Sequence, residues 1–272
     1  LDDLKEDNKI NMPKSITEVS TGKYLKIENE LKNVLSKYRF ETDNPNSLIY
    51  ILKNLTSYIP SSTNVSQFAD ISLYEHLKLT AAIASCMYLY TEEKNITDYK
   101  DRYFIKAEQN RDKKEYLMVS MELSGIQNFI YTITSTGAAK MLKARSFYLE
   151  LLMENVIDEI LEKVELTKAN IIYNGGAHSY LLLPNTDRTK KVLEDAKQTI
   201  NNWLIEKLGN KLYLSLEYIE CCANNFNNTE NNYNINELFI ELTKKVSKNK
   251  LQRYNREQLY KLLEPIQIDS NQ

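Results

Sequence analysis

The sequence predicts an α+β fold, in which a ferredoxin-like sheet lies between an N-terminal helical region and C-terminal helices. Three observations support this prediction. From residue 115 onward, apolar runs follow the order βααββαβ, a split βαβ unit with one extra helix. Gly175-Gly176 separates two short apolar runs and is typical of a hairpin. Outside this region, apolar residues recur at helical spacing.

The elements of the predicted sheet follow from the spacing of apolar residues. Tyr116 to Leu123 is an apolar run typical of a buried strand. The helical segments carry apolar stripes, for example Leu149, Met153 and Val156. The other predicted elements are helices at 125–135, 139–164 and 187–208 and strands at 169–173, 179–183 and 212–218.

Helices are also expected on both sides of the sheet region, at 25–38, 48–59, 72–90, 236–254 and 255–263. Ser72 and Glu75 form a capping box at the start of the third. Residues 223–236 are rich in Asn and are expected to be a loop or linker. The predicted domains are a mostly helical region at 1–110, a palm-like domain at 111–222, the Asn-rich segment at 223–236 and C-terminal helices at 237–272.

Composition is that of an ordinary globular protein, with 42% hydrophobic and 26% charged residues and no apolar run of membrane-span length. The formal net charge is −2, so any contact with nucleic acid must depend on local basic patches. Cys86, Cys221 and Cys222 have no C-x-x-C spacing, which argues against a zinc ribbon or a disulfide framework and fits a reducing cytoplasm. Because the sequence opens on Leu1 rather than Met, we expect a piece of a longer protein.

Metal-dependent chemistry would have to come from the end of the first strand and the hairpin tip. In nucleotide cyclases and polymerase palms, those two elements hold a nucleotide and its metals, and two-metal transfer needs several carboxylates. Glu122 lies at the strand end, but no Asp or Glu occurs from Ala169 to Pro184. Glu122 alone is a poor metal site, and the alternative is a solvated strand-end charge.

The same frame is better suited to binding a nucleotide. Gly125 lets backbone amides at a helix start approach a phosphate, and the hairpin glycines could admit a base or ribose. The alternative is that these glycines serve only turn geometry. Lys140, Lys143 and Arg145 could contact a triphosphate or form a solvated face. The candidate nucleotide-binding residues are Ser124, Gly125, Gln127, Lys140, Arg145, Gly175 and Gly176.

Other chemistry has less support in the sequence. Neither His76 nor His178 is followed by Asp, so the His-Asp dyad of metal phosphohydrolases is absent, and His76 alone is better explained as a packed residue. No G-x-S-x-G motif indicates a serine nucleophile. A basic run could follow RNA or form a solvated helix surface; its members are Lys244, Lys245, Lys248, Lys250, Arg253 and Arg256.

Several segments resemble one known family, the large subunit of type III-A CRISPR effector (Csm) complexes. Asp70 to Ala84 strongly resembles a segment of that subunit. Ser124 to Tyr131, Ala144 to Glu150 and Ile171 to Asn185 resemble its first palm. The matches span residues 57 to 220 in the right order, so their joint specificity is high.

The resemblance implies a multidomain parent in which an N-terminal permuted HD domain cuts single-stranded DNA. It also implies two palms that together bind two ATP molecules and make cyclic oligoadenylates when target RNA pairs with the guide. In that family the first palm is non-catalytic, and the His76 helix would close the HD domain, where His76 would be a metal ligand only if that domain is intact. The implied cofactors are ATP and Mg or Mn; the implied partners are other Csm subunits, guide and target RNA, and single-stranded DNA.

The sequence departs from the family in ways that affect activity. Glu122 stands where the family usually has Asp. The HD dipeptide, the cysteine-rich zinc element and the Gly-Gly-Asp-Asp hairpin of the second palm are missing. We therefore expect this chain alone to be inactive, with no catalytic residue of its own. Two alternatives are a non-enzymatic ferredoxin-like RNA-binding scaffold, such as an inactive homologue, and a stand-alone diguanylate-type cyclase, which the missing hairpin acids disfavour.

Overall fold

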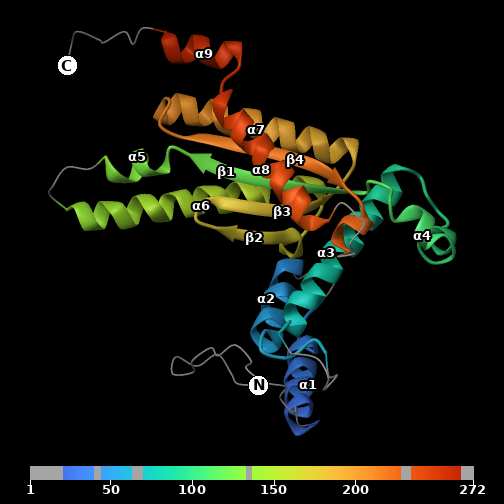
Figure 1. Cartoon of the computed structure of the whole chain (residues 1–272). Helices are drawn as coiled ribbons and strands as arrows, with labels where there is room; N and C mark the ends of the chain where they lie inside the picture. Colours follow the sequence, from blue (N-terminus) through green and yellow to red (C-terminus); the bar gives the residue numbers. More distant parts are fainter. Residues whose placement is uncertain (1–20, 40–43, 63–69, 133–136, 228–233, 265–272) are drawn as a thin grey trace. The chain divides into compact units, whose positions relative to one another are not determined.

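The computed structural model describes residues 21–39, 44–62, 70–132, 137–227 and 234–264 (Figure 1). The chain forms two compact units. Unit 1 comprises Leu1–Ala84 and Leu166–Asn170, and unit 2 comprises Ser85–Glu165 and Ile171–Gln272. Within the described ranges, no helix has the length and apolarity needed to cross a membrane.

Unit 1 is helical. It contains α1 (Thr21–Leu35), α2 (Pro45–Thr56), the first part of α3 (Leu73–Glu93) and the 3-10 helix η2 (Lys168–Asn170). The Asn44 side chain caps α2 by accepting a 2.8 Å hydrogen bond from the backbone N–H of Asn46. The Asn46 side chain in turn accepts from the backbone N–H of Lys168 at 2.8 Å, which fastens the distant segment to α2.

Unit 2 is built on a four-stranded antiparallel sheet with the strand order β2-β3-β1-β4. The strands are β1 (Tyr116–Ser124), β2 (Ile171–Gly175), β3 (His178–Pro184) and β4 (Tyr213–Cys221). This order, with the first and last strands as neighbours, is the ferredoxin-like arrangement of a palm. The fold class predicted from the sequence is therefore confirmed.

Helices cover both faces of the sheet (Figure 1). The two long helices α6 and α7 pack against each other on one face, and α8 packs on β4 and β1 on the other. Thr186 caps α7 by accepting from the backbone N–H of Thr189 at 3.0 Å. The bounds are α5 (Ile126–Tyr131), α6 (Ala138–Val164), α7 (Asp187–Leu208), η3 (Ala223–Phe226), α8 (Ile235–Leu251) and α9 (Arg256–Leu263).

The two faces of β1 differ in chemistry because side chains alternate along a strand. The odd-numbered residues from Leu117 to Leu123 are fully apolar and 0–2% exposed, and they form the core under α6 and α7. The even-numbered positions, on the face that α8 covers, begin with the buried Tyr116 and Met118 and continue with Ser120, Glu122 and Ser124. Polar groups are thus collected on this face toward the end of β1, and the candidate site lies there.

The edge strand β4 is completed by a side chain instead of another strand. The Asn201 side-chain amide of α7 donates to the Leu214 carbonyl and accepts from the Leu214 N–H, both at 2.9 Å. Asn201 is only 3% exposed, so both of these buried backbone groups are satisfied. This contact also fixes the position of α7 along the strand.

The structure extends the sequence predictions in several places. The π-helix η1 (Asp101–Ile105) and α4 (Ala107–Asn110) were not foreseen. The helix predicted at 125–135 is shorter, because α5 ends at Tyr131; residues 133–135 lie outside the described ranges. Part of the Asn-rich segment forms η3, and residues 228–233 lie outside the described ranges. The helix α8, expected to follow the palm, packs on its sheet. The predicted domain boundaries stay predictions.

A buried ion pair fastens η1 to the start of β1. The Arg102 guanidinium donates to Oε1 of Glu115, and the Tyr103 hydroxyl donates to Oε2 at 3.0 Å. The two charged side chains are 11% and 3% exposed. Burial, and then the neighbouring Glu115 carboxylate, raises the pKa of Tyr103 to about 12, so its hydroxyl stays a donor at neutral pH. The network therefore depends on all three groups.

Arg102→Met should destabilise unit 2 strongly, because it leaves the Glu115 carboxylate buried without its cation. The expected loss in the free energy of unfolding is about 3–5 kcal/mol. The matched control is Lys106→Met, which breaks a pair with Asp101 whose side chains are 54% and 35% exposed. That change should cost no more than about 1 kcal/mol. Urea unfolding followed by circular dichroism measures both, and equal losses would contradict the argument.

Candidate functional site

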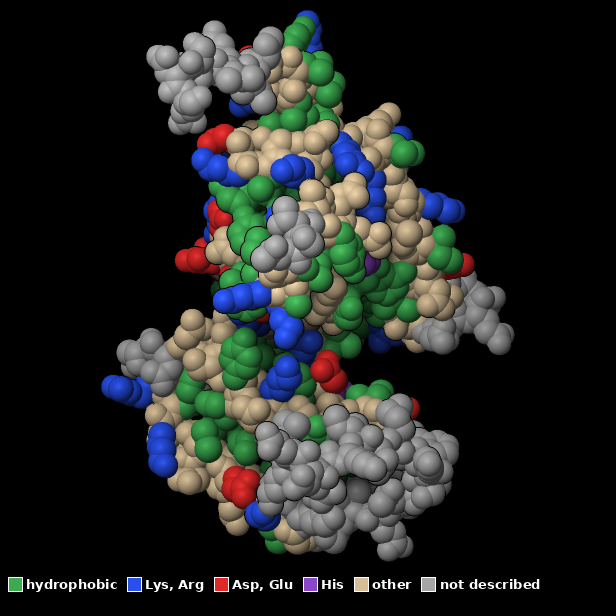
Figure 2. All heavy atoms as spheres, turned by 90° about the vertical axis from the view of Figure 1, so that its left-hand side faces the viewer, with side chains coloured by type: hydrophobic (Ala, Val, Ile, Leu, Met, Phe, Trp, Pro, Cys, Tyr) green, Lys and Arg blue, Asp and Glu red, His purple; other side chains and the backbone are tan. Residues whose placement is uncertain are grey.

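The end of β1 and the tip of the β2–β3 hairpin lie side by side at one edge of the palm. Glu122 is paired in register with His178, and the backbone N–H of Leu123 donates to the Ala177 carbonyl at 3.1 Å. The structure therefore brings together the two elements that the sequence singled out. Figure 2 shows the side of the molecule toward which β1 points, where hydrophobic side chains lie next to Lys and Arg.

The hairpin tip is a two-residue loop without an acid. Gly176 and Ala177 both have φ of +61°, the positive backbone angle that a type I′ turn requires at both positions. For Ala177 this conformation costs about 1–2 kcal/mol. The turn thus holds the tip in a tight geometry, but it presents a methyl group and an imidazole where a metal-binding palm presents carboxylates.

Glu122 is neutralised by a lysine from α8. Its carboxylate lies 2.5 Å from the Lys250 ammonium, and the two side chains are 31% and 28% exposed. A divalent metal would have to displace this ammonium and would then find one carboxylate, whereas metal-assisted transfer needs a set. In the described part of the chain, no group of three or more His, Cys, Asp or Glu side chains is placed to hold a metal ion. The residues present do not fit a metal site.

His178 is held in its neutral form beside this ion pair. Burial lowers the pKa of His178 below its usual value; Glu122 opposes the shift and Lys250 adds to it. Its Nε2 lies 3.2 Å from the Ser120 hydroxyl, a hydrogen-bond distance. A neutral imidazole next to an already paired carboxylate contributes no charge to the site at neutral pH.

Ser124 and Gly125 take different roles in the structure. The Ser124 hydroxyl oxygen is buried and has no hydrogen-bond partner among the described residues. Gly125 has φ of +90°, and a Cβ there would lie 2.0 Å from the Lys211 carbonyl oxygen. Glycine is therefore required for close packing of the α5 start, and a larger residue would disturb the fold before it blocked a phosphate.

The other predicted ligands are dispersed. Gln127 on α5 and Lys140 on α6 are exposed. The Arg145 guanidinium donates to the carbonyls of Phe129 and Thr132 at 2.5 and 2.9 Å, so it joins α6 to α5. His76 is exposed on the part of α3 that belongs to unit 1. Gly175 and Gly176 lie at the hairpin tip as predicted, and the nucleotide contacts of all these residues stay predictions.

The basic run of α8 and α9 does not form one free surface. Lys250 is paired with Glu122, and Lys245 donates to the Tyr218 carbonyl at 3.2 Å. Arg253 donates to the Lys250 carbonyl at 3.0 Å. The Arg256 guanidinium donates to the Tyr260 hydroxyl at 3.2 Å. Four of the six predicted members therefore have internal contacts, which leaves less charge for an RNA track than the sequence indicated.

Two features of the site were missed by sequence reasoning. One is the partner of Glu122, because Lys250 lies more than a hundred residues away and was counted only as part of the basic run. The other is a set of aromatic rings beside the hairpin. The alternation of His178 and Tyr180 along β3 was a usable signal for it, since alternate strand residues share a face.

Fold and site define a class: a ferredoxin-like palm whose described residues lack the set of carboxylates that a cyclase uses to hold metals. The family described as Csm1 subunit domain B matches residues 115–265. This match covers more than half of the chain, and the chain belongs to that family.

Curated relatives carry the name CRISPR system single-strand-specific deoxyribonuclease Cas10/Csm1 (subtype III-A). The protein from Mycobacterium tuberculosis is 39% identical over 96% of this chain. The protein from Enterococcus italicus is 38% identical over 88% of it. The chain spans about a third of the length of these relatives, 33% and 32% respectively.

Solved structures of Csm1 share the fold. A Csm1–Csm4 cassette in complex with pppApA is similar over 93% of this chain and 33% of that one, with a TM-score of 0.81 and 28% identity. A cassette in complex with one ATP has a TM-score of 0.79 and 29% identity, again over 93% and 33%. The resemblance stated from the sequence is confirmed by these relatives.

Gly125→Ala should destabilise unit 2 more than Gly176→Ala. Both positions have positive φ and share the cost of about 1–2 kcal/mol for alanine there. Only the Gly125 change forces a Cβ onto a backbone oxygen, which should add about 1–3 kcal/mol; at Gly176 nothing lies within 4 Å. Thermal and urea unfolding of the two variants test this. A Gly125→Ala protein as stable as Gly176→Ala would show that α5 can shift freely.

Proposed function

We propose that this chain is the first palm of a Cas10/Csm1 large subunit and that it binds an adenine nucleotide without catalysing its conversion. The observation that carries the proposal is the ion pair between Glu122 and Lys250. A palm that holds metal uses its strand-end carboxylate as a metal ligand, whereas here the Lys250 ammonium of α8 is paired with it. The hairpin, which ends in Ala177-His178, adds no acid.

The larger protein is proposed to have the activities of the relatives. Their name supports cleavage of single-stranded DNA, and structures of related cassettes with ATP, pppApA and cA4 support synthesis of cyclic oligoadenylate. ATP with Mg or Mn would then be converted by catalytic residues that the second palm supplies. Csm4 and other Csm subunits, guide RNA, target RNA and single-stranded DNA are the proposed partners, in the cytoplasm.

Within this chain, the nucleotide is proposed to lie along the edge formed by the β1 end and the hairpin. The Ser124 hydroxyl supports this placement, because it lies at the end of β1 and has no hydrogen-bond partner among the described residues. Gly175 and Gly176 would allow close approach to the hairpin backbone. Gln127, Lys140 and Arg145 are proposed to contribute at the α5–α6 side. A second palm would supply the opposite half of the site.

ATP should bind the chain weakly, because only half of a composite site is present. Ligand-observed NMR at millimolar ATP should detect this binding, while a protein that also contains the second palm should bind clearly by calorimetry. Ser124→Ala, which removes the free hydroxyl, should weaken binding in both, and Ser247→Ala, an exposed serine of α8, is the control. Tight binding by the chain alone would contradict the composite site, and no effect of Ser124→Ala would move the nucleotide elsewhere.

The chain alone should neither make oligoadenylate nor cut single-stranded DNA. Among the described residues, Glu122 is the one carboxylate at the β1 end and hairpin tip and is already paired, while metal-assisted displacement needs a set of ligands. Incubation with manganese, ATP and single-stranded DNA, followed by chromatography and gel analysis, tests both activities. Oligoadenylate from a preparation free of full-length enzyme would refute the non-catalytic assignment. Lys250→Met should also stay inactive, because the hairpin still lacks an acid.

A further inference from the structure

Four aromatic side chains form a ring cluster on the sheet face that α8 covers. Tyr180 of β3 lies at its centre, with its ring centroid 4.5 Å from that of His178 and 4.8 Å from that of Phe239 of α8. Tyr173 of β2 lies at the outer end, 6.4 Å from Tyr180 and 6.5 Å from His178. The cluster thus runs from α8 across β3 to the edge strand of the sheet.

Tyr173 is the exposed member of the ring cluster. It is 52% exposed, whereas His178, Tyr180 and Phe239 are only partly accessible. Its ring meets the edge of His178 at 85° and is tilted by 48° against Tyr180. Two neighbours therefore hold the ring while much of its surface stays in solvent. A ring fixed in this way loses little conformational entropy when a flat ligand covers it.

The ring cluster adjoins the proposed nucleotide edge. The Tyr173 hydroxyl lies 2.9 Å from the position that a Cβ on Gly175 would take, so the phenol rests against the hairpin glycine. His178 is paired in register with Glu122 of β1, so the Glu122–Lys250 ion pair lies next to the His178 side of the cluster. The exposed Tyr173 ring, which could stack on a base, thus lies next to the hairpin glycines, whose backbone could contact the ribose or a phosphate.

We propose that the Tyr173 ring is a stacking platform for the base of a purine nucleoside triphosphate, with His178 and Tyr180 holding it in place. This inference rests on the proposed function and names the part of the ligand that the hairpin side of the site recognises. Aromatic side chains on a sheet face bind bases in this manner because every base offers a π-face, and a purine offers the larger one. Structures of relatives with ATP and pppApA agree with a purine.

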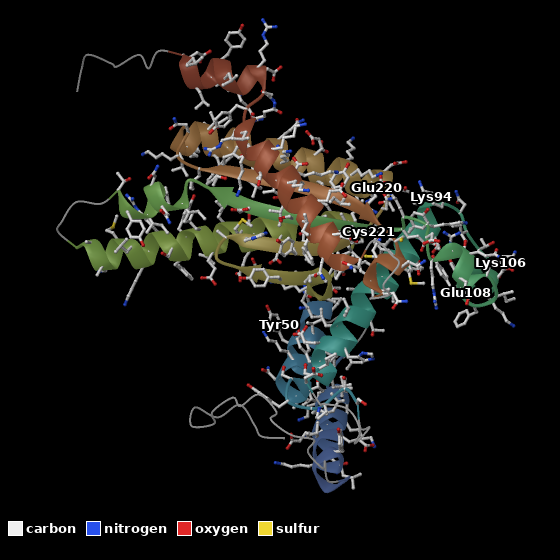
Figure 3. All side chains as sticks on the ribbon, viewed as in Figure 1. Tyr50, Lys94, Lys106, Glu108, Glu220 and Cys221 are labelled. Carbon is white, nitrogen blue, oxygen red and sulfur yellow. The ribbon has the colours of Figure 1, made fainter. Side chains whose placement is uncertain are left out.

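The test compares ATP with inorganic tripolyphosphate, which lacks a base. By ligand-observed NMR titration, Tyr173→Leu should weaken ATP binding by about fivefold or more, while tripolyphosphate binding is unchanged. Tyr173→Phe keeps the ring and should bind as the unmodified chain does. Tyr50→Leu is the matched control, because Tyr50 is a tyrosine of equal exposure, 53%, on α2 of the other unit (Figure 3).

Each other outcome overturns part of the assignment. If Tyr173→Leu binds ATP as well as the unmodified chain, the stacking inference fails and the proposed function stands. If the unmodified chain binds no ATP, both fail. Equal losses for ATP and tripolyphosphate would show that Tyr173 acts on phosphates or on the fold. The same titrations can use an oligoadenylate RNA that lacks a 5′-triphosphate. If Tyr173→Leu weakened the binding of this RNA and left ATP binding unchanged, the ring would be assigned to RNA instead of a free nucleotide.

A second variant gives an independent measurement that does not depend on a loss of binding. Tyr173→Trp keeps a stacking surface and places an indole at the platform. A stacked base should quench its fluorescence on addition of ATP, and tripolyphosphate should not. Because Tyr173 is exposed on an edge strand, the fold should tolerate the change, which thermal unfolding checks. Absence of ATP-dependent quenching, with ATP still bound by NMR, would refute the platform.

Discussion

The ion pair between Glu122 and Lys250 is the interaction on which the character of this palm depends. It joins the end of β1 to the C-terminal part of α8, at the position where the β1 end meets the hairpin. The lysine neutralises the carboxylate that could have served a metal, and it does so from a partly buried position where screening by solvent is reduced. One contact thus pairs the carboxylate at the strand end with a lysine of α8, while the buried Leu238, Leu242 and Val246 hold the helix on the sheet.

The rest of the site follows from the polar face of the sheet that α8 covers. Ser120, His178 and Ser215 lie on this face, and Asn249 of α8 accepts from the Tyr213 and Ser215 hydroxyls at 2.9 and 3.0 Å. The opposite face is apolar and buried under α6 and α7. The face under α8 is mixed, because Tyr116 and Met118 of β1 are also on it and are buried. Its polar groups are gathered toward the end of β1, next to the hairpin tip.

Gly125 shows that a motif can be identified correctly while one of its contacts stays unforeseen. Its place in a Ser-Gly turn indicated close approach of a phosphate, which stays a prediction. The structure adds a close approach to the Lys211 carbonyl, a contact within the protein that also requires glycine. Arg145 is similar, because the guanidinium expected on a phosphate donates to the carbonyls of Phe129 and Thr132. In both, the neighbour that matters lies in another element, and a local pattern does not name it.

The sequence by itself determined the fold class and the position of most strands and helices, because hydrophobic periodicity is a local pattern that can be recognised in a single sequence. It also determined that the hairpin has no acid, since that depends only on which residues stand between Ala169 and Pro184. Only the tertiary structure decided that Lys250 neutralises Glu122 and that Phe239 joins Tyr180, His178 and Tyr173 in one cluster. Those contacts join residues from separate elements, and their pairing depends on how α8 packs on the sheet.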